Sequence, residues 1–124
     1  MRHRLTHREL DIMAVLWRQG SATVGDVKAG VSDPIAYSTV LTILRILEGK
    51  GHVRHEMDGK AFRYYAVTKP DQAGDSVLQR LVSKVYHGSR EMLIARLVSD
   101  RKITAAELKR IRKQLDERLK EMKP

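Results

Sequence analysis

Residues 37–67 read YSTVLTILRILEGKGHVRHEMDGKAFRYYAV, and this segment is the most informative about the fold. Its first part repeats apolar residues at helical spacing and ends in Gly49-Lys50-Gly51, which predicts a helix over about 37–49. The period then changes, because two β-rich runs, residues 52–57 and 61–67, flank Asp58-Gly59. An Asp-Gly pair between two such runs is the strongest short-range signal of a hairpin. The stretch therefore predicts a helix followed by a β-hairpin.

Two further helices are predicted before this stretch. Thr6 and Glu9 form a capping box, and the apolar residues that follow it recur at helical spacing. A shorter helix is predicted to begin near Thr23 and to run to about Gly30. Three helices and then a hairpin, within residues 1–68, are the elements of a winged helix-turn-helix, whose third helix enters the DNA major groove.

The third predicted helix has one apolar face and one polar face. With Val40 set at 0° and successive residues placed about 100° apart, Leu44 falls close to it on the core side. Ser38, Thr42 and Arg45 fall on the opposite side, at about 140–200°. Short hydroxyls and one arginine can reach phosphates or base edges. Since any soluble helix has a polar face, the strip is also compatible with a purely structural helix.

The candidate DNA contacts extend beyond that strip. Ile46, which flanks it, either packs against a neighbouring element or touches a thymine methyl group or a sugar. The basic residues of the hairpin, which would be the wing, either follow the phosphate backbone or are solvated strand residues. The full candidate set is Tyr37, Ser38, Thr39, Thr42, Arg45, Ile46, Arg54, Lys60 and Arg63.

Residues 69–124 predict only helices. Pro70 stands at a first helical position, and Ser89 and Thr104 cap two more helices. Three amphipathic helices of this total length bury too little apolar surface to be stable alone, so we expect a second copy of the same segment as their partner. The alternative is packing against the winged domain of the same chain. The candidate dimer residues are Leu78, Leu81, Val82, Leu97, Leu108, Ile111 and Leu115.

The expected architecture is therefore mostly α with a small β-hairpin. An N-terminal winged helix-turn-helix, the DNA-binding domain, covers residues 1–68, and a three-helix C-terminal dimerisation arm covers residues 69–124.

Charge narrows the choice of partner. The 124 residues include 24 Lys and Arg against 15 Asp and Glu, a net charge of +9, which favours a polyanion and most often nucleic acid. Residues 1–68 carry 10 − 7 = +3, and residues 69–124 carry 14 − 8 = +6. Charge alone therefore does not locate a DNA site. The basic residues of the last helix form either a solvated face or a non-specific contact with DNA or an acidic protein.

Other classes of protein are disfavoured. The chain has no cysteine, which excludes disulfides and thiolate zinc sites. No apolar run reaches the roughly 20 residues of a membrane helix, and the basic start leads into no hydrophobic signal region, so we expect a cytoplasmic protein without membrane insertion. His55-Glu56 does not continue into a zinc-binding HExxH, and neither a phosphate-binding loop nor Gly-x-Ser-x-Gly occurs. We expect no enzyme, no cofactor and no bound metal.

Several motifs resemble the penicillinase-repressor family. They are Leu5-Thr6 with Glu9, Ile12-Met13, Leu16-Trp17, Tyr37-Ser38-Thr39-Val40 through Leu44 and Leu47, and Gly51-His52-Val53. The resemblance covers nearly the whole chain and implies a homodimeric winged-helix repressor that blocks transcription from a palindromic DNA operator. By position, it implies that Ser38, Thr39, Thr42 and Arg45 are the DNA-facing residues of the recognition helix.

The chain departs from the family pattern in three places. The family often has a basic residue where this chain has Ile46, which weakens one expected phosphate contact. Its copper-responsive branch depends on a cysteine-rich C-terminal hook that is missing here. Its drug-resistance repressors are inactivated by cleavage at an Asn-Phe bond, but this chain has no Asn and its single Phe is Phe62, in the wing. The inducing signal, for which a membrane-bound protease sensor is one candidate, therefore does not transfer directly.

Two other functions stay open from the sequence. The first is a winged-helix protein-interaction module that docks an acidic partner through its basic tail and has only non-specific affinity for DNA. The second is a repressor gated by a small ligand between the winged domain and the tail, although no polar cluster in the sequence names such a ligand.

Overall fold

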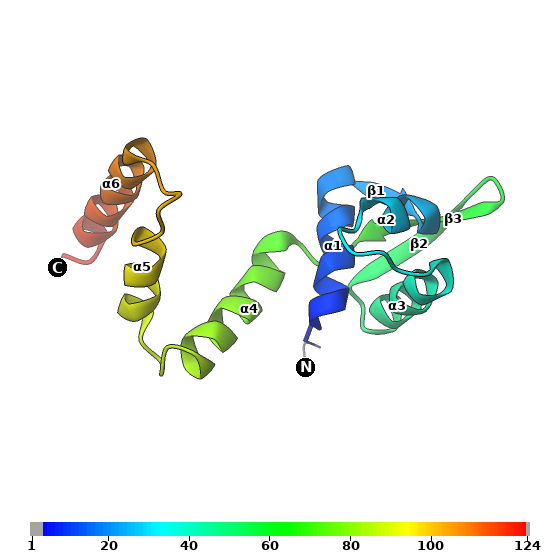
Figure 1. Ribbon diagram of the computed structural model, residues 1–124, viewed down its shortest axis with the longest axis horizontal. Helices are drawn as coiled ribbons and strands as arrows, with labels where there is room; N and C mark the ends of the chain where they lie inside the picture. Colours follow the sequence, from blue (N-terminus) through cyan, green and yellow to red (C-terminus); the bar gives the residue numbers. More distant parts are fainter. Residues whose placement is uncertain (1–3, 124) are drawn as a thin grey trace. The chain divides into compact units, whose positions relative to one another are not determined.

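The computed structural model describes residues 4–123 (Figure 1). In chain order its elements are α1 (His7–Gln19), β1 (Ser21–Thr23), α2 (Val24–Gly30), α3 (Tyr37–Gly49), β2 (Val53–Asp58), β3 (Ala61–Ala66), α4 (Pro70–Lys84), α5 (Arg90–Val98) and α6 (Ala105–Glu121). The mostly helical fold with a small β-hairpin confirms the predicted class.

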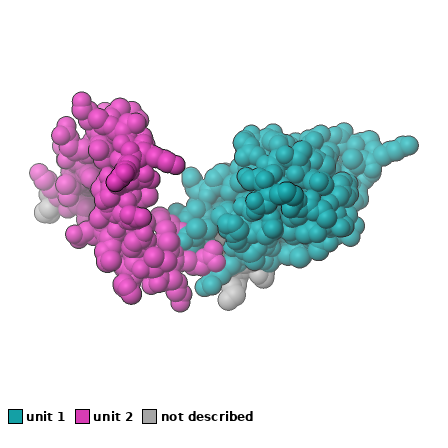
Figure 2. Space-filling view, in the orientation of Figure 1, with its two compact units in different colours: residues 1–77 teal, residues 78–124 magenta. Residues whose placement is uncertain are grey.

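The chain divides into two compact units, residues 1–77 and residues 78–124 (Figure 2). This division lies inside α4, so the first turns of that helix belong to the first unit. The functional boundary expected between residues 68 and 69 stays a prediction. Within the part of the chain that is described, no helix is long and apolar enough to cross a membrane.

Helix starts follow the local signals of the sequence. At α1 the Thr6 hydroxyl accepts from the Glu9 amide at 3.2 Å, and the Glu9 carboxylate accepts from the Thr6 amide at 2.8 Å. Equivalent capping boxes begin α2 and α6, and the Ser89 side chain caps α5. Each box satisfies amides that have no partner within the helix, which confirms the predicted starts.

The sheet has three antiparallel strands in the order β1-β3-β2. The hairpin of β2 and β3 was predicted, whereas β1 was not. Side chains alternate between the two faces, so the cross-strand pair His55 and Tyr64 lies on one face and Arg54 and Tyr65 lie on the other. The hairpin loop projects beyond the helices of this unit (Figure 1).

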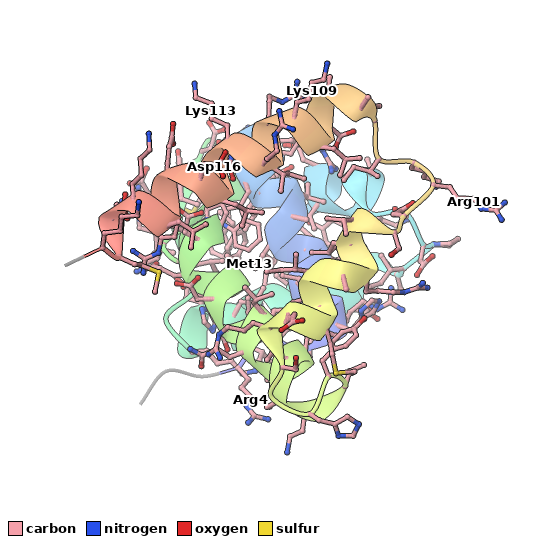
Figure 3. All side chains as sticks on the ribbon, turned by 90° about the vertical axis from the view of Figure 1, so that its left-hand side faces the viewer. Arg4, Met13, Arg101, Lys109, Lys113 and Asp116 are labelled. Carbon is pink, nitrogen blue, oxygen red and sulfur yellow. The ribbon has the colours of Figure 1, made fainter. Side chains whose placement is uncertain are left out.

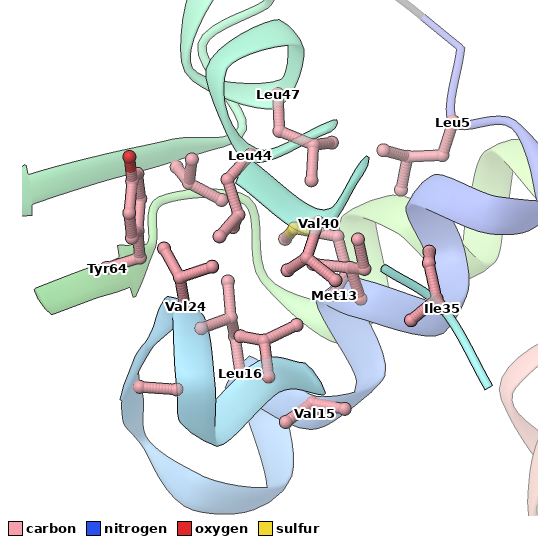
Figure 4. Close-up of a cluster of buried hydrophobic side chains, with 14 of the residues drawn as sticks. Leu5, Met13, Val15, Leu16, Val24, Ile35, Val40, Leu44, Leu47 and Tyr64 are labelled. Atoms are coloured by element: carbon pink, nitrogen blue, oxygen red, sulfur yellow. The ribbon is translucent and has the colours of Figure 1, made fainter. Parts of the chain in front are cut away.

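The hydrophobic core lies in the first unit, where α1, α2, α3 and the sheet meet (Figure 4). Val40, Leu44 and Leu47 are fully buried, which confirms the apolar face expected for α3. Tyr64 of β3 is 1% exposed and joins the sheet to this core. The core fixes α3 by three side chains on one face and leaves the other face free.

Candidate nucleic-acid interface

The polar strip of α3 faces solvent. Ser38, Thr39, Thr42 and Arg45 are all exposed, as are Tyr37 and Ile46 at 54% and 47%. All six candidate contacts on this helix are therefore accessible to solvent. Ile46 does not pack into the protein interior, which leaves it available for contact with another molecule.

Two of these side chains differ in their hydrogen bonding. The Thr42 hydroxyl donates to the Ser38 carbonyl at 2.9 Å, a bond within one turn of the helix. The Thr42 oxygen keeps its lone pairs and can still accept a hydrogen bond. Among residues 4–123, the Arg45 side chain has neither a hydrogen bond nor an ion pair. Its five N–H donors are free for a phosphate or for a base edge.

The outer face of the wing carries paired charges. Arg54 donates to Glu56 at 2.7 Å, and its guanidinium lies 4.4 Å from the centre of the Tyr65 ring. Such exposed ion pairs contribute little stability, about 0–1 kcal/mol, because water screens both charges. Arg54 can therefore exchange its carboxylate for a phosphate at small cost. The sequence did not predict this pairing.

Arg63 is more tightly engaged than a free wing cation. Its Nε donates to Asp58 at 2.8 Å and a terminal nitrogen donates to Ser21 at 3.2 Å, while Asp26 lies 3.9 Å away. The hydrogen bond to Asp58, followed by the charges of Asp58 and Asp26, raises the pKa of Arg63 above its ordinary value. Arg63 thus ties β3 to β1 and to the start of α2, and its predicted contact with DNA stays a prediction.

Lys60 lies in the hairpin turn, at the end of the wing. It is exposed, and within the described residues its ammonium has no ion pair or hydrogen bond. Of the three basic wing residues proposed from sequence, Lys60 is therefore the cation available without breaking an existing contact.

The wing and α3 are joined by a contact that sequence reasoning missed. His55 Nδ1 of β2 lies 2.8 and 2.7 Å from the two carboxylate oxygens of Glu48 in α3. The imidazole also packs against Phe62 and Tyr64 of β3, at ring-centre distances of 4.4 and 5.5 Å. No local sequence pattern predicts this contact, because the two residues belong to different elements.

A second missed contact fixes the end of α3. Lys50 Nζ lies 2.9 Å from both carboxylate oxygens of Glu9 and 3.2 Å from the Arg4 carbonyl. Glu9 is buried, which raises its pKa, but the hydrogen bonds and charge of Lys50 and the bonds from Thr6 outweigh burial and lower the pKa below its ordinary value. The capping residue of α1 therefore also anchors the residue that follows α3.

The second unit leaves a large apolar surface exposed. Of the predicted dimer residues, Val82 is 7% exposed and buried in the single chain, and Ile111 is half-buried. The other five lie between 37% and 58% exposed: Leu78, Leu81, Leu97, Leu108 and Leu115. Monomeric soluble proteins rarely leave such a group of large apolar side chains uncovered.

The last helix shows this surface most clearly. α6 has no buried residue, and Leu119 and Met122 extend its apolar side at 61% and 66% exposure. Lys109 and Lys113, one turn apart, extend away from the helix into solvent (Figure 3). The helix is thus amphipathic, and its apolar side is only partly covered in the single chain, where Ile111 is half-buried.

Within residues 4–123, no group of three or more His, Cys, Asp or Glu side chains is placed to bind a metal ion. Among the nine candidate contacts, the polar side chains supply hydroxyls, the unpaired Arg45 and Lys60, and the paired Arg54 and Arg63.

Comparison with known proteins agrees with this arrangement. The family model of the penicillinase repressor matches residues 5–117. The penicillinase repressor of Bacillus licheniformis is 21% identical over 115 residues, covering 91% of this chain and 90% of that protein.

Two solved structures are also similar in part. One is BpsR of Bordetella bronchiseptica, whose DNA binding is regulated by 6-hydroxynicotinic acid; it has 18% identity and a TM-score of 0.48, covering 91% of this chain and 74% of that chain. The other is a MarR-family transcriptional regulator from Silicibacter pomeroyi, with 21% identity and a TM-score of 0.49, covering 96% and 73%.

The match of the family model extends over both compact units. It includes the capping box of α1, the exposed strip of α3, the wing and most of α6. The chain therefore belongs to the penicillinase repressor family of winged-helix, DNA-binding transcriptional repressors, which are not enzymes.

Proposed function

We propose that this chain is a sequence-specific repressor that binds a palindromic operator as a homodimer. The observation that carries the proposal is the polar strip of α3, which is fully exposed on a helix whose opposite face is locked into the core by Val40, Leu44 and Leu47. A rigid helix that presents hydroxyls and one free arginine is suited to the major groove. Occupation of the operator then blocks the polymerase.

The direct reader of base sequence in this proposal is Arg45. Its guanidinium is free of partners in the described part of the chain, and it can bind a guanine edge through two parallel hydrogen bonds. Ser38, Thr39 and Thr42 contact phosphates or base edges beside it, and Tyr37 and Ile46 supply apolar contact with sugars or thymine methyl groups.

The wing follows the phosphate backbone in this proposal. Lys60 contacts a phosphate directly, since its ammonium is exposed at the hairpin turn. Arg54 and Arg63 contribute by exchanging their carboxylate partners for phosphates, and Arg63 has the larger number of contacts to give up. We therefore rank Lys60 first and Arg63 last among the three.

The second unit forms the dimer. Its exposed leucines need a hydrophobic partner, and a second copy of the chain presents the same surface, as a two-fold interface requires. The interface residues are Leu78, Leu81, Leu97, Leu108, Ile111 and Leu115, whereas Val82 is buried within its own chain. Two-fold symmetry then matches the palindrome, with one α3 for each half-site. The family resemblance leaves a membrane-bound protease sensor as a candidate inducer.

The experiment is a fluorescence-anisotropy titration of the full chain. One duplex contains the promoter region of the chain's own gene, and a second of equal length has a scrambled sequence, each at about 50 and 200 mM salt. We expect a preference for the native duplex at both salt concentrations. Equal affinity for the two duplexes, with binding lost at the higher salt, would instead favour the protein-interaction module.

Arg45→Ala tests the proposed reader. We expect a loss of about 1–3 kcal/mol on the native duplex and a much smaller loss on the scrambled one. Arg118→Ala is the matched control, because Arg118 pairs with Glu121 at 3.0 Å in α6 and its loss changes the net charge equally. Equal losses on both duplexes for Arg45→Ala would show that Arg45 does not specify sequence.

A further inference from the structure

The contact between Glu48 and His55 joins the two elements of the proposed DNA interface, α3 and the wing. Glu48 lies near the end of α3, and His55 lies in β2 of the wing. His55 Nδ1 is 2.7 and 2.8 Å from the carboxylate oxygens. An ionised carboxylate only accepts hydrogen bonds, so Nδ1 carries the proton and donates it. The bond is therefore charge-assisted, which makes it stronger than a bond between two neutral groups.

Two aromatic rings of β3 hold the His55 imidazole in place. Phe62 and the buried Tyr64 pack against it from β3, with ring centres 4.4 and 5.5 Å away. Tyr64 is in turn close to three ionisable groups that affect its pKa: Glu48, Arg45 and Tyr37. A continuous path thus runs from the core through Tyr64 and His55 to the carboxylate on α3.

Other polar contacts of the wing do not reach α3. Arg54 pairs with Glu56 within β2, and Arg63 bonds to Asp58 and Ser21 within the sheet. Among the side-chain hydrogen bonds of the described residues, the Glu48–His55 bond is the one that joins α3 to the hairpin. β1 supports the hairpin from the β3 side, along residues 63–65, whereas β2 is the other edge strand of the sheet. The Glu48–His55 bond therefore supports the hairpin from the β2 side, next to α3.

We propose that Glu48 and His55 are positioning residues for DNA binding. Their contact holds the wing at a fixed place relative to α3, so that the helix and the tip at Lys60 engage one duplex together. Preorganisation of this kind lowers the cost of ordering the wing when DNA binds. The inference rests on the proposed function, and it adds two residues that are not themselves required to touch DNA.

The test separates the contact from the charge. Glu48→Gln and Glu48→Ala remove the same negative charge, which lies one turn after Arg45. Glutamine keeps an oxygen that accepts from His55, whereas alanine does not. Alanine also favours helix, so neither variant is expected to unfold α3. The parent, Glu48→Gln and Glu48→Ala are each prepared with and without Lys60→Ala. All six proteins are titrated with the native promoter duplex.

The readout is the salt dependence of the dissociation constant. One phosphate contact contributes a slope of about 0.9 in log K against log salt, which is about 3.5-fold between 50 and 200 mM. We expect Lys60→Ala to reduce the ratio of the dissociation constant at 200 mM salt to that at 50 mM salt by about 3.5-fold, both in the parent and in Glu48→Gln. In Glu48→Ala we expect almost no further reduction, because the wing is no longer held on the duplex. If Glu48 only stabilised the fold, the effects of Glu48→Ala and Lys60→Ala on the salt dependence would be additive.

His55→Ala removes the same contact from the other side, so it should abolish the effect of Lys60→Ala as Glu48→Ala does. His7→Ala, on α1, controls for the removal of one histidine. Thermal melting of each variant confirms that it is folded. Equal reductions for Lys60→Ala in Glu48→Gln and Glu48→Ala would overturn the proposal. No reduction in the parent would overturn it as well, because the wing would then make no phosphate contact. A parent that does not prefer the native duplex would instead overturn the proposed function.

Discussion

The close approach of α1 and α2 gives a prediction that can be worked out from distances. Gly30 is the last residue of α2, and a Cβ atom added there would lie 2.9 Å from Val15 Cγ1 and 3.3 Å from Val15 Cγ2. It would also lie 3.2 Å from Gln19 Nε2, but that side chain is long and can move. Val15 is 1% exposed and β-branched, so its rotamer is restricted and the backbone must shift instead.

Gly30→Ala combines two opposing effects. Alanine is favoured over glycine in a helix by about 1 kcal/mol, and by less at a helix end. Forcing an extra methyl group into a close-packed contact costs about 1–3 kcal/mol. The contact is shorter than real Cβ atoms tolerate, so overpacking wins and we expect a net loss of about 1–2 kcal/mol. For a domain of this size, the loss lowers the melting temperature by roughly 5–15 °C.

Trp17 supplies the assay. It is the single tryptophan of the chain, and its Nε1 donates to the Thr68 carbonyl at 2.8 Å, so its emission reports on the first unit. Urea titration followed by tryptophan fluorescence should give a lower midpoint with an unchanged slope, because the surface exposed on unfolding stays the same.

Gly49→Ala is the matched control. Gly49 is the last residue of α3, its φ is outside the left-handed region, and an added Cβ would meet no atom within 4 Å. We expect Gly49→Ala to be neutral or stabilising by about 0.4–1 kcal/mol, through the entropy of the unfolded chain. The packing argument is refuted if Gly30→Ala is as stable as Gly49→Ala.

Three further predictions concern the dimer, an ion pair and a turn. Leu115→Glu should convert the proposed dimer to a monomer in light scattering after gel filtration, because it puts a charge on the exposed apolar side of α6, whereas Lys113→Glu should not. Two dimers, or two monomers, would contradict the assignment of that side. The lowered pKa of Glu9 contributes stability that is fully present above the ordinary pKa of 4.5 and is lost as the pH falls through the lower pKa of the folded state. The urea concentration at the midpoint of unfolding of the parent should therefore decrease once the pH is lowered below about 4.5. Lys50→Met should be less stable at pH 7 and lose less stability between pH 7 and pH 3, and parallel pH profiles would exclude this role of the pair. His87 has a φ of 52°, so His87→Gly should raise the thermal stability of the second unit by up to about 1 kcal/mol at fixed protein concentration, and a lower melting temperature would show that the imidazole contributes more than the strain.

The elements that depend on interactions between near neighbours could be predicted from the sequence. The sequence correctly predicted the capping box at Thr6, the helix start near Thr23 and the bounds of α3, because each signal involves residues within about four positions of one another. The Asp58-Gly59 turn likewise identified the hairpin. The exposed strip of α3 also followed from local periodicity, since the face opposite a buried stripe must meet solvent.

Which side chains have hydrogen-bond and ion-pair partners depends on tertiary packing. Strand β1 has three residues and no pattern of its own, and it exists because it pairs with β3. Arg63 bonds to Ser21, 42 positions away, and Lys50 bonds to Glu9, 41 positions away. The sequence shows that a residue is basic, but not whether a carboxylate already neutralises it. Pairing depends on distances that only packing of the whole unit sets, which is why the free cations at Arg45 and Lys60 could be told from the engaged ones only in the folded chain.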